Sequence, residues 1–170
     1  SAFGCGAATI NVAYEKPASG KRTATVGWYN TEALESRARE EGVEVHTFYG
    51  DAFSDEMKED VASLIEKQWG DVDLVIYSLA SGVRTDPKTG EQYRSALKPV
   101  GEPFTAKTVD TMTGEIKEVT AEPATEEEIT ATVKVMGGED WQLWMDLLLD
   151  RGLLAEGAVT MAYSYIGPEL

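Results

Sequence analysis

Three short apolar segments of this chain run directly into acidic or small residues, side-chain types that suit a polar ligand. Ala8–Tyr14 runs into Glu15, Val43–Tyr49 is followed by Asp51 and Ala52, and Leu74–Tyr77 runs into Ser78–Gly82. Ligands of wound α/β proteins bind outside the carboxyl ends of the strands, so the three junctions together indicate a nucleotide crevice as readily as three ordinary turns. Each junction taken singly is typical of an ordinary turn.

Glu15 has the most specific chemistry of these residues. An acidic side chain after a strand of a dinucleotide-binding sheet accepts hydrogen bonds from the adenosine ribose hydroxyls of NAD, and its charge repels a 2′-phosphate. The alternative is a solvated charge at a strand end, and position alone leaves both interpretations open.

Other reactive side chains favour structural roles. Gly4-Cys5-Gly6 precedes a strand, whereas a phosphate-binding glycine loop follows a strand and opens a helix, so any such loop lies upstream of this chain. Cys5 is then a small packing residue. His46 alternates with Val45 and Thr47 in a predicted strand and has no obvious carboxylate partner nearby in sequence. We therefore expect a structural histidine there.

Two further patterns also favour structure over chemistry. Trp141 and Trp144 have helical spacing, which is more typical of a core than of a ligand platform. Glu126–Glu128 indicates the start of a helix rather than a pair of catalytic carboxylates. The sequence contains no Ser/His/Asp set, P-loop or zinc-ligand spacing.

Composition narrows the functional classes. The chain has 170 residues and a net charge of -15, which disfavours nucleic acid and anionic membranes as partners. One cysteine and one histidine exclude an internal disulfide and a multi-histidine metal site. The sequence shows no apolar run of about 20 residues and no signal peptide, so we expect a soluble cytoplasmic protein. Both ends look cut, since the chain opens without Met and stops just after a predicted strand.

Alternating strand and helix patterns predict a parallel sheet wound with helices. The predicted strands are Ala8–Tyr14, Val43–Tyr49, Leu74–Tyr77 and Ala158–Tyr165. A first helix is expected from a cap at Asn30 or Thr31 to Glu41, with Gly42 as its terminating glycine. A second is capped by Ser54 and presents Met57, Val61, Leu64 and Ile65 on one face.

The region after Ser81 breaks this alternation. Asp86–Gly90 and Asp110–Gly114 predict two hairpin turns. Thr125 and Glu128 form a capping box for a helix with Ile129, Val133 and Met136 on one face, which Gly137-Gly138 ends. The last predicted helix presents an apolar stripe of Trp141, Trp144, Met145, Leu148 and Leu149.

Nine short runs give the chain a family resemblance that covers essentially its whole length. They are Gly27–Asn30, Gly50–Asp55, Tyr77–Ser81, Arg84–Gly90, Arg94–Pro99, Gly101–Phe104, Glu122–Glu126, Val135–Trp141 and Ala162–Gly167. With these runs the chain resembles the FabV-type trans-2-enoyl-CoA and enoyl-acyl-carrier-protein reductases of bacteria.

The resemblance implies a fold, a reaction and a set of contact residues. The fold is α/β, a Rossmann-type parallel sheet of the short-chain-dehydrogenase kind with flanking helices, in one domain over residues 1–170 with a substrate-side lid at about 82–120. The reaction is NADH-dependent reduction of the C2–C3 double bond of a trans-2-enoyl thioester of CoA or acyl-carrier protein, and the parent family suggests a monomer. By motif, the cofactor contacts are Tyr14, Glu15, Asp51, Ala52, Leu79 and Ala80, and Tyr165 contacts the substrate.

Two of the family's motifs fall outside this chain. The phosphate loop precedes residue 1, and the catalytic tyrosine, eight residues and then a lysine, follows Leu170. Tyr49 and Lys58 have that spacing, but they join a strand end to a helix, and we discount them. The chain then corresponds to a central segment that is inactive by itself. Its strands Ala8–Tyr14 and Leu74–Tyr77 lack the neighbour between them, so we expect either that the segment is marginally stable or that the two strands pair directly.

A second hypothesis is a non-catalytic nucleotide-binding or interaction domain with the same fold. Flanking coding sequence separates the two hypotheses. A third, another short-chain dehydrogenase, requires Tyr-x3-Lys, and no tyrosine of the chain has a lysine four residues on. The sequence does not distinguish CoA from carrier-protein thioesters.

Overall fold

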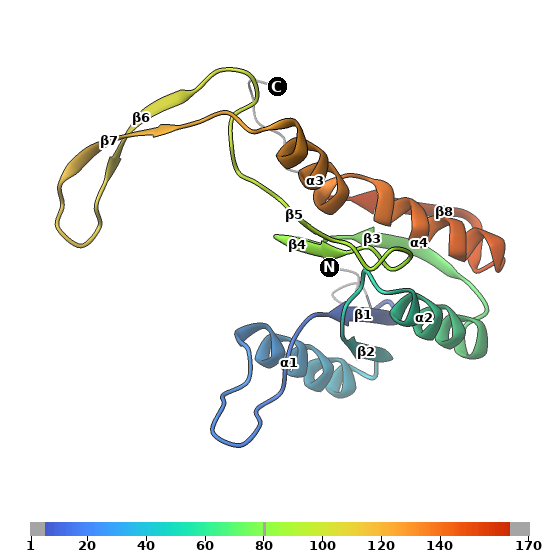
Figure 1. Cartoon of the computed structure of the whole chain (residues 1–170). Helices are drawn as coiled ribbons and strands as arrows, with labels where there is room; N and C mark the ends of the chain where they lie inside the picture. Colours follow the sequence, from blue (N-terminus) through green and yellow to red (C-terminus); the bar gives the residue numbers. More distant parts are fainter. Residues whose placement is uncertain (1–5, 80, 164–170) are drawn as a thin grey trace. The chain divides into compact units, whose positions relative to one another are not determined.

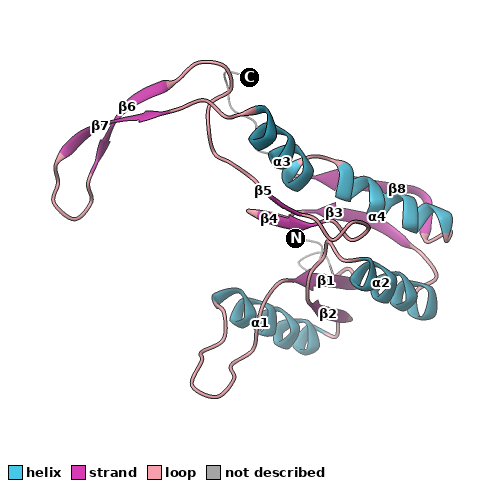
Figure 2. Ribbon diagram, in the orientation of Figure 1, coloured by secondary structure: helices cyan, strands magenta, loops and turns pink. Residues whose placement is uncertain are grey.

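The computed structural model describes residues 6–79 and 81–163 (Figures 1 and 2). Four helices lie within them: α1 (Val26–Glu41), α2 (Asp55–Gln68), α3 (Glu126–Met136) and α4 (Glu139–Asp150). Eight strands are described: β1 (Thr9–Ala13), β2 (Val45–Tyr49), β3 (Val72–Tyr77), β4 (Val83–Thr85), β5 (Gln92–Arg94), β6 (Phe104–Val109), β7 (Ile116–Ala121) and β8 (Leu154–Ala162).

The chain divides into two compact units. One consists of Ser1–Asp73 with Trp144–Val159, and the other of Leu74–Leu143 with Thr160–Leu170. Strands β3 and β8 and helix α4 contribute residues to both. The single domain over residues 1–170, with a lid at about 82–120, stays a prediction.

In the first unit, β1 and β2 form a parallel pair. Thr9 lies opposite Val45 at the start and Ala13 opposite Tyr49 at the end. A parallel pair needs a crossover connection, which α1 provides. The predicted first two strands and their parallel arrangement are confirmed, although β1 is half-buried rather than buried.

Helix α1 begins earlier than predicted. Its N-cap is Thr25, not Asn30 or Thr31, and Thr31 is buried in the second turn. The side chain of Thr25 makes no capping bond because its hydroxyl binds the backbone of Lys16. The predicted end is confirmed, since Gly42 adopts a left-handed φ of 70° that favours glycine.

Helix α2 supplies part of the core of the first unit. Ser54 caps it as predicted, accepting a bond from the backbone N–H of Met57 at 3.2 Å. Val61 and Ile65 are buried as predicted, whereas Leu64 is half-buried and Ala62 is fully buried in its place. From α4, Trp144 and Leu148 are also buried, but Leu149 is 61% exposed, so the predicted stripe on α4 was too wide.

Strand β8 pairs with β3 and begins four residues before the predicted start. The N–H of Val72 donates to the carbonyl of Leu153, and farther along the N–H of Tyr163 donates to the carbonyl of Tyr77, each at 3.0 Å. From the first bond to the second, the residue numbers increase along both strands, so the pair is parallel. Among the described residues β3 has no second partner, and direct pairing of β1 with β3 is not observed.

The burial predicted for β3 is wrong. Leu74 is 42% exposed and Ile76 is 45% exposed. A strand paired on one side alone leaves an open edge and apolar side chains that a second neighbour would cover.

The second unit contains both predicted hairpins, β4–β5 and β6–β7. The capping box of α3 is confirmed, with the Thr125 hydroxyl accepting from the N–H of Glu128 and the Glu128 carboxylate accepting from the N–H of Thr125. The face predicted for α3 is wrong, because Val133 is 61% exposed while Val135 is buried. Helix α3 packs on β4 and β5, which places Val135 on its inner side.

Candidate cofactor site

The carboxyl ends of β1 and β2 bring four of the predicted cofactor residues to one edge. Ala13 and Tyr49 are opposite each other, and the N–H of Gly50 donates to the carbonyl of Ala13 at 3.0 Å. Glu15 and Asp51 each follow two residues after this last pair. A carboxylate therefore leaves each of two neighbouring parallel strands at the edge where such sheets bind ligands.

The backbone at Glu15 is tied to the start of α1. Thr25 N–H donates to the carbonyl of Lys16 at 3.0 Å, and the hydroxyl of Thr25 accepts from the N–H of Lys16 at 2.9 Å. These bonds close the loop between the two residues. The half-buried carboxylate of Glu15 consequently lies against Gly27 in the first turn of α1.

Asp51 and Ala52 build the turn between β2 and α2. Oδ1 of Asp51 accepts from the N–H of Phe53 at 2.9 Å. Ala52 is 8% exposed, and its carbonyl accepts from Nε1 of Trp144 at 3.1 Å. The carbonyl of Ala52 is therefore engaged within the first unit, which leaves Asp51 as the more accessible of the two residues.

The aromatic residues beside this edge differ in exposure and in partner. Tyr14 is 71% exposed, and Nζ of Lys16 lies 5.6 Å from the centre of its ring. The hydroxyl of Tyr49 donates to Glu32 at 2.8 Å. Burial and then this hydrogen bond raise the pKa of Tyr49 to about 12, so at neutral pH its hydroxyl keeps its proton.

Lys58, nine residues after Tyr49, has a structural position. It is buried, and its Nζ donates to the carbonyl of Phe53 at 2.7 Å and lies 5.6 Å from the ring centre of Trp144. A catalytic lysine of this kind has to reach the tyrosine hydroxyl. Tyr49 and Lys58 bind different partners, Glu32 and the backbone of Phe53.

Of the remaining predicted residues, the structure describes Leu79 alone. It belongs to the second unit and is half-buried, two residues after the end of β3. Ala80 and Tyr165 lie outside the described residues. The roles of all the predicted contact residues stay predictions.

Sequence reasoning missed a buried polar network in the second unit. Arg84 of β4 is 2% exposed, and its guanidinium donates to the carbonyl of Lys134 at 2.7 Å and to Glu139 at 2.6 Å. Tyr77 donates to Asp140, which is 1% exposed, at 3.0 Å. Both ends of the loop between β3 and β4 are thereby fixed to the junction of α3 and α4.

The network also changes the acidity of its members. Burial, with the nearby charge of Asp140, raises the pKa of Tyr77 well above its usual range. The hydrogen bond from Lys134 lowers the pKa of Glu139. A buried charge needs a partner of opposite charge. The sequence signal for this network was therefore Arg84 within a strand together with two acidic residues, Glu139 and Asp140, some 50 residues later.

The interpretation of His46 needs one correction. Its Nε2 lies 2.7 Å from Oε1 of Glu44, so a carboxylate partner stands two residues away in the sequence. Alternate residues of an extended chain project from the same face, and the two side chains meet for this reason. The hydrogen bond lowers the pKa of Glu44.

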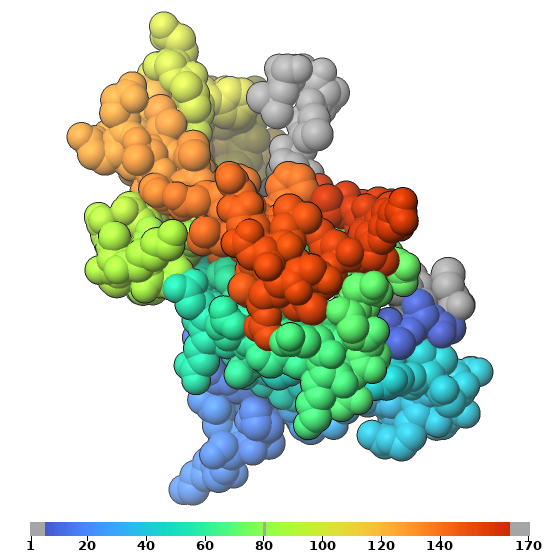
Figure 3. Space-filling model, turned by 90° about the vertical axis from the view of Figure 1, so that its right-hand side faces the viewer, coloured from blue at the N-terminus to red at the C-terminus, as the bar shows by residue number. Residues whose placement is uncertain are grey.

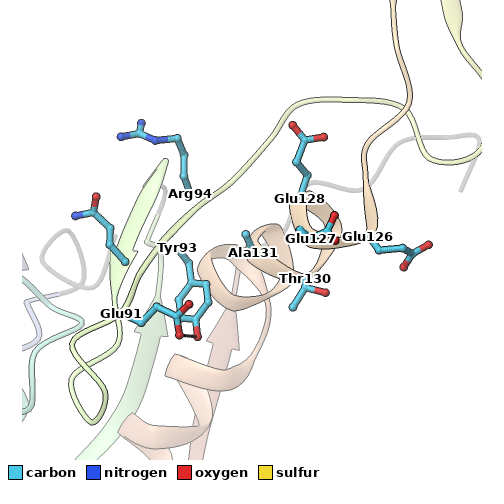
Figure 4. Close-up of a pocket in the computed structure, with 9 residues that line it drawn as sticks. Glu91, Tyr93, Arg94, Glu126, Glu127, Glu128, Thr130 and Ala131 are labelled. Atoms are coloured by element: carbon cyan, nitrogen blue, oxygen red, sulfur yellow. Dashed lines mark hydrogen bonds between the residues drawn. The ribbon is translucent and has the colours of Figure 1, made fainter.

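A cavity of about 630 Å³ lies between β5 and the first turns of α3 (Figure 4). Its lining includes four glutamates, Glu91 and Glu126–Glu128, and one arginine, Arg94. Glu91 accepts from the hydroxyl of Tyr93 at 2.7 Å, and Glu128 accepts from Nζ of Lys98 at 2.6 Å. The excess of carboxylates disfavours an anionic ligand such as the phosphates of CoA. None of the predicted contact residues lines it.

No helix within residues 6–79 and 81–163 is both long and apolar enough to cross a membrane. Over the same residues, no group of three or more His, Cys, Asp and Glu side chains could hold a metal ion.

Comparisons with known proteins agree on one family. The model of the trans-2-enoyl-CoA reductase catalytic region matches residues 22–170. Enoyl-acyl-carrier-protein reductases (NADH) from Cytophaga hutchinsonii and Opitutus terrae are 56% and 58% identical over the whole chain, which spans 43% of their length. The crystal structure of Treponema denticola trans-2-enoyl-CoA reductase with NAD matches at a TM-score of 0.92 and 56% identity, covering 99% of this chain and 42% of that one.

Proposed function

Since this chain belongs to the trans-2-enoyl-CoA reductase family, we propose that it forms the adenosine side of the NADH site of an enoyl-thioester reductase. The observation that carries the proposal is the pair of carboxylates, Glu15 and Asp51, leaving the carboxyl ends of two paired parallel strands. Relatives named for NADH, and one crystallised with NAD, support the choice of cofactor. The predicted Rossmann-type α/β fold is confirmed by the same structural match.

The residues at this edge suit a nucleoside without a 2′-phosphate. Glu15 accepts hydrogen bonds from the ribose hydroxyls and repels an added phosphate, while Asp51 and Ala52 border the adenine. Tyr14 offers an exposed ring beside them. Leu79 and Ala80 supply backbone contacts near the ribose and the nicotinamide side of the cofactor.

When bound, NADH supplies a hydride to C3 of a trans-2-enoyl thioester, and a proton is added at C2. The thioester carbonyl carries the enolate charge in between, and a tyrosine and a lysine beyond Leu170 stabilise it and deliver the proton. Tyr165 contacts the substrate, and residues 82–120 form part of the lid. The substrates are thioesters of CoA or acyl-carrier protein in fatty acid synthesis, in the cytoplasm.

Titration calorimetry of NADH into the chain tests the cofactor assignment. We expect binding at about micromolar Kd, and Glu15→Ala should weaken it about tenfold or more, because a hydrogen bond to a charged group contributes about 1.5–3 kcal/mol. Glu40→Ala removes an equal charge from the exposed end of α1 and should leave the Kd unchanged. A cooperatively folded chain that does not bind NADH would contradict the proposal.

A further inference from the structure

Gly27 lies next to the carboxylate of Glu15. A methyl group on Gly27 would be 1.9 Å from Oε1 and 2.4 Å from Cδ of Glu15. Ordinary contact needs 3.4 Å or more, so Oε1 would have to move by about 1.5 Å. The carboxylate therefore occupies the space that any larger residue at position 27 would fill.

Backbone hydrogen bonds hold the main chain next to Glu15 in place. The bonds between Lys16 and Thr25 tie the residue next to Glu15 to the N-cap of α1, two residues before Gly27. The bonded backbone fixes where the Glu15 side chain begins, and the missing Cβ of Gly27 leaves room for its carboxylate beside α1. Neither residue needs to touch a ligand to have this effect.

Alanine at position 27 should displace the Glu15 carboxylate without disturbing the fold of α1. Gly27 lies in helical backbone and is not among the glycines with positive φ, so alanine fits the conformation there. The atoms that a methyl group would meet belong to the end of one flexible side chain, Glu15. Alanine is also the better helix former, so the substitution should not destabilise α1.

We propose that Gly27 is a positioning residue that sets where the Glu15 carboxylate lies, and thereby the preference for NADH over NADPH. The inference rests on the proposed function, in which Glu15 faces the adenosine ribose. A displacement of about 1.5 Å is enough to break a hydrogen bond, whose donor–acceptor distance is about 2.7–3.2 Å. Moving the charge away from the ribose also weakens its repulsion of a 2′-phosphate.

A double-mutant cycle tests this inference, with the Kd of NADH and of NADPH measured for wild type, Gly27→Ala, Glu15→Ala and the double variant. We expect Gly27→Ala to weaken NADH binding about tenfold, equal to about 1.4 kcal/mol, and to lower the NADH-to-NADPH preference by a similar factor. In the Glu15→Ala background it should change neither Kd by more than about twofold. The thermal midpoint of Gly27→Ala should hold or rise.

The outcomes separate this inference from the proposed function. If Glu15→Ala weakens NADH binding but Gly27→Ala does not, the positioning role is wrong and the cofactor assignment stands. If Gly27→Ala is equally harmful with and without Glu15, it acts on the fold and the inference is also wrong. If Glu15→Ala has no effect on either nucleotide, the assignment of Glu15 fails first, and the role of Gly27 fails with it.

Discussion

The hairpins β4–β5 and β6–β7 contain nearly the same turn but differ in how they are anchored. In each, an aspartate Oδ1 accepts two backbone N–H bonds, from Lys88 and Thr89 for Asp86 and from Met112 and Thr113 for Asp110. Gly90 and Gly114 close the turns with φ of 73° and 74°. The local chemistry of the two turns is therefore equivalent.

Their strands differ. Arg84 of β4 is buried and bonded to Lys134 and Glu139, whereas all six residues of β6 are exposed. In β7, five of the six residues are exposed as well. The end of this strand, orange in the space-filling view, lies at the surface (Figure 3). Phe104 and Ile116, apolar residues of this ribbon, are 62% and 73% exposed. A turn sequence thus specifies a hairpin, but long-range bonds decide whether it becomes part of a core.

Removing the anchor should have the largest effect. We expect Arg84→Ala to lower the free energy of unfolding by about 2–3 kcal/mol, because it empties the space of a side chain that is 2% exposed and removes its bonds to Lys134 and Glu139. Urea unfolding followed by tryptophan fluorescence measures the change. Arg94→Ala, in the exposed part of the same hairpin, is the matched control and should cost less than about 0.5 kcal/mol.

The two substitutions bear directly on the difference between the hairpins. Equal destabilisation by Arg84→Ala and Arg94→Ala would show that the buried guanidinium adds nothing to the anchoring of β4–β5. The two hairpins would then differ in solvent exposure but not in how firmly they are held.

The elements that the sequence predicted best are those that local residues determine. Asp86–Gly90, the Ser54 cap and the Thr125–Glu128 capping box each place all their partners within a few residues. Except for the missed contact of His46 with Glu44, two residues away, the errors come from distant partners. Helix α1 begins after Thr25, whose hydroxyl binds the backbone of Lys16, and not at the predicted Asn30 or Thr31. Strand β8, which pairs with β3, begins at Leu154, whereas the sequence pattern predicted a start at Ala158.

The candidate site follows the same division. Parallel pairing of β1 and β2 was predictable, and it brings Glu15 and Asp51 to one edge. The contact of Glu15 with Gly27 was not, because it depends on the closed loop between them. The burial of Arg84 was not predictable from its local sequence, because its partners Lys134 and Glu139 lie 50 and 55 residues farther along the chain.

The turn glycines provide the second test. Alanine at a left-handed φ costs about 1–2 kcal/mol, and the local cost should be the same for Gly90→Ala and Gly114→Ala. Global unfolding should detect the first substitution alone, because the exposed β6–β7 hairpin can open locally. Hydrogen exchange of the turn amides should increase in both variants, and a similar loss of global stability in both would contradict the comparison.

The turn aspartates give a pH test. The backbone N–H bonds, from Lys88 to Asp86 and from Met112 to Asp110, lower both pKa values below the ordinary 3.8. A depressed folded-state pKa contributes stability above the unfolded value, and that contribution is lost as pH falls through the folded value. NMR titration should therefore find both carboxyls ionised to unusually low pH. An ordinary pKa for Asp110 alone would show that its turn does not form without an anchor.

The smallest effect is expected at a cross-strand pair of the exposed ribbon. The hydroxyls of Thr105 and Thr120 lie 2.8 Å apart on β6 and β7. Thr105→Ala removes this hydrogen bond and should cost about 0.2–1 kcal/mol in the stability of the ribbon, which is the range for such pairs. Hydrogen exchange of the β6–β7 amides should show that loss, while urea unfolding of the chain should not change. A shift in the urea midpoint would mean that β6–β7 unfolds together with the rest of its unit, and that exposure of a hairpin does not imply its independence.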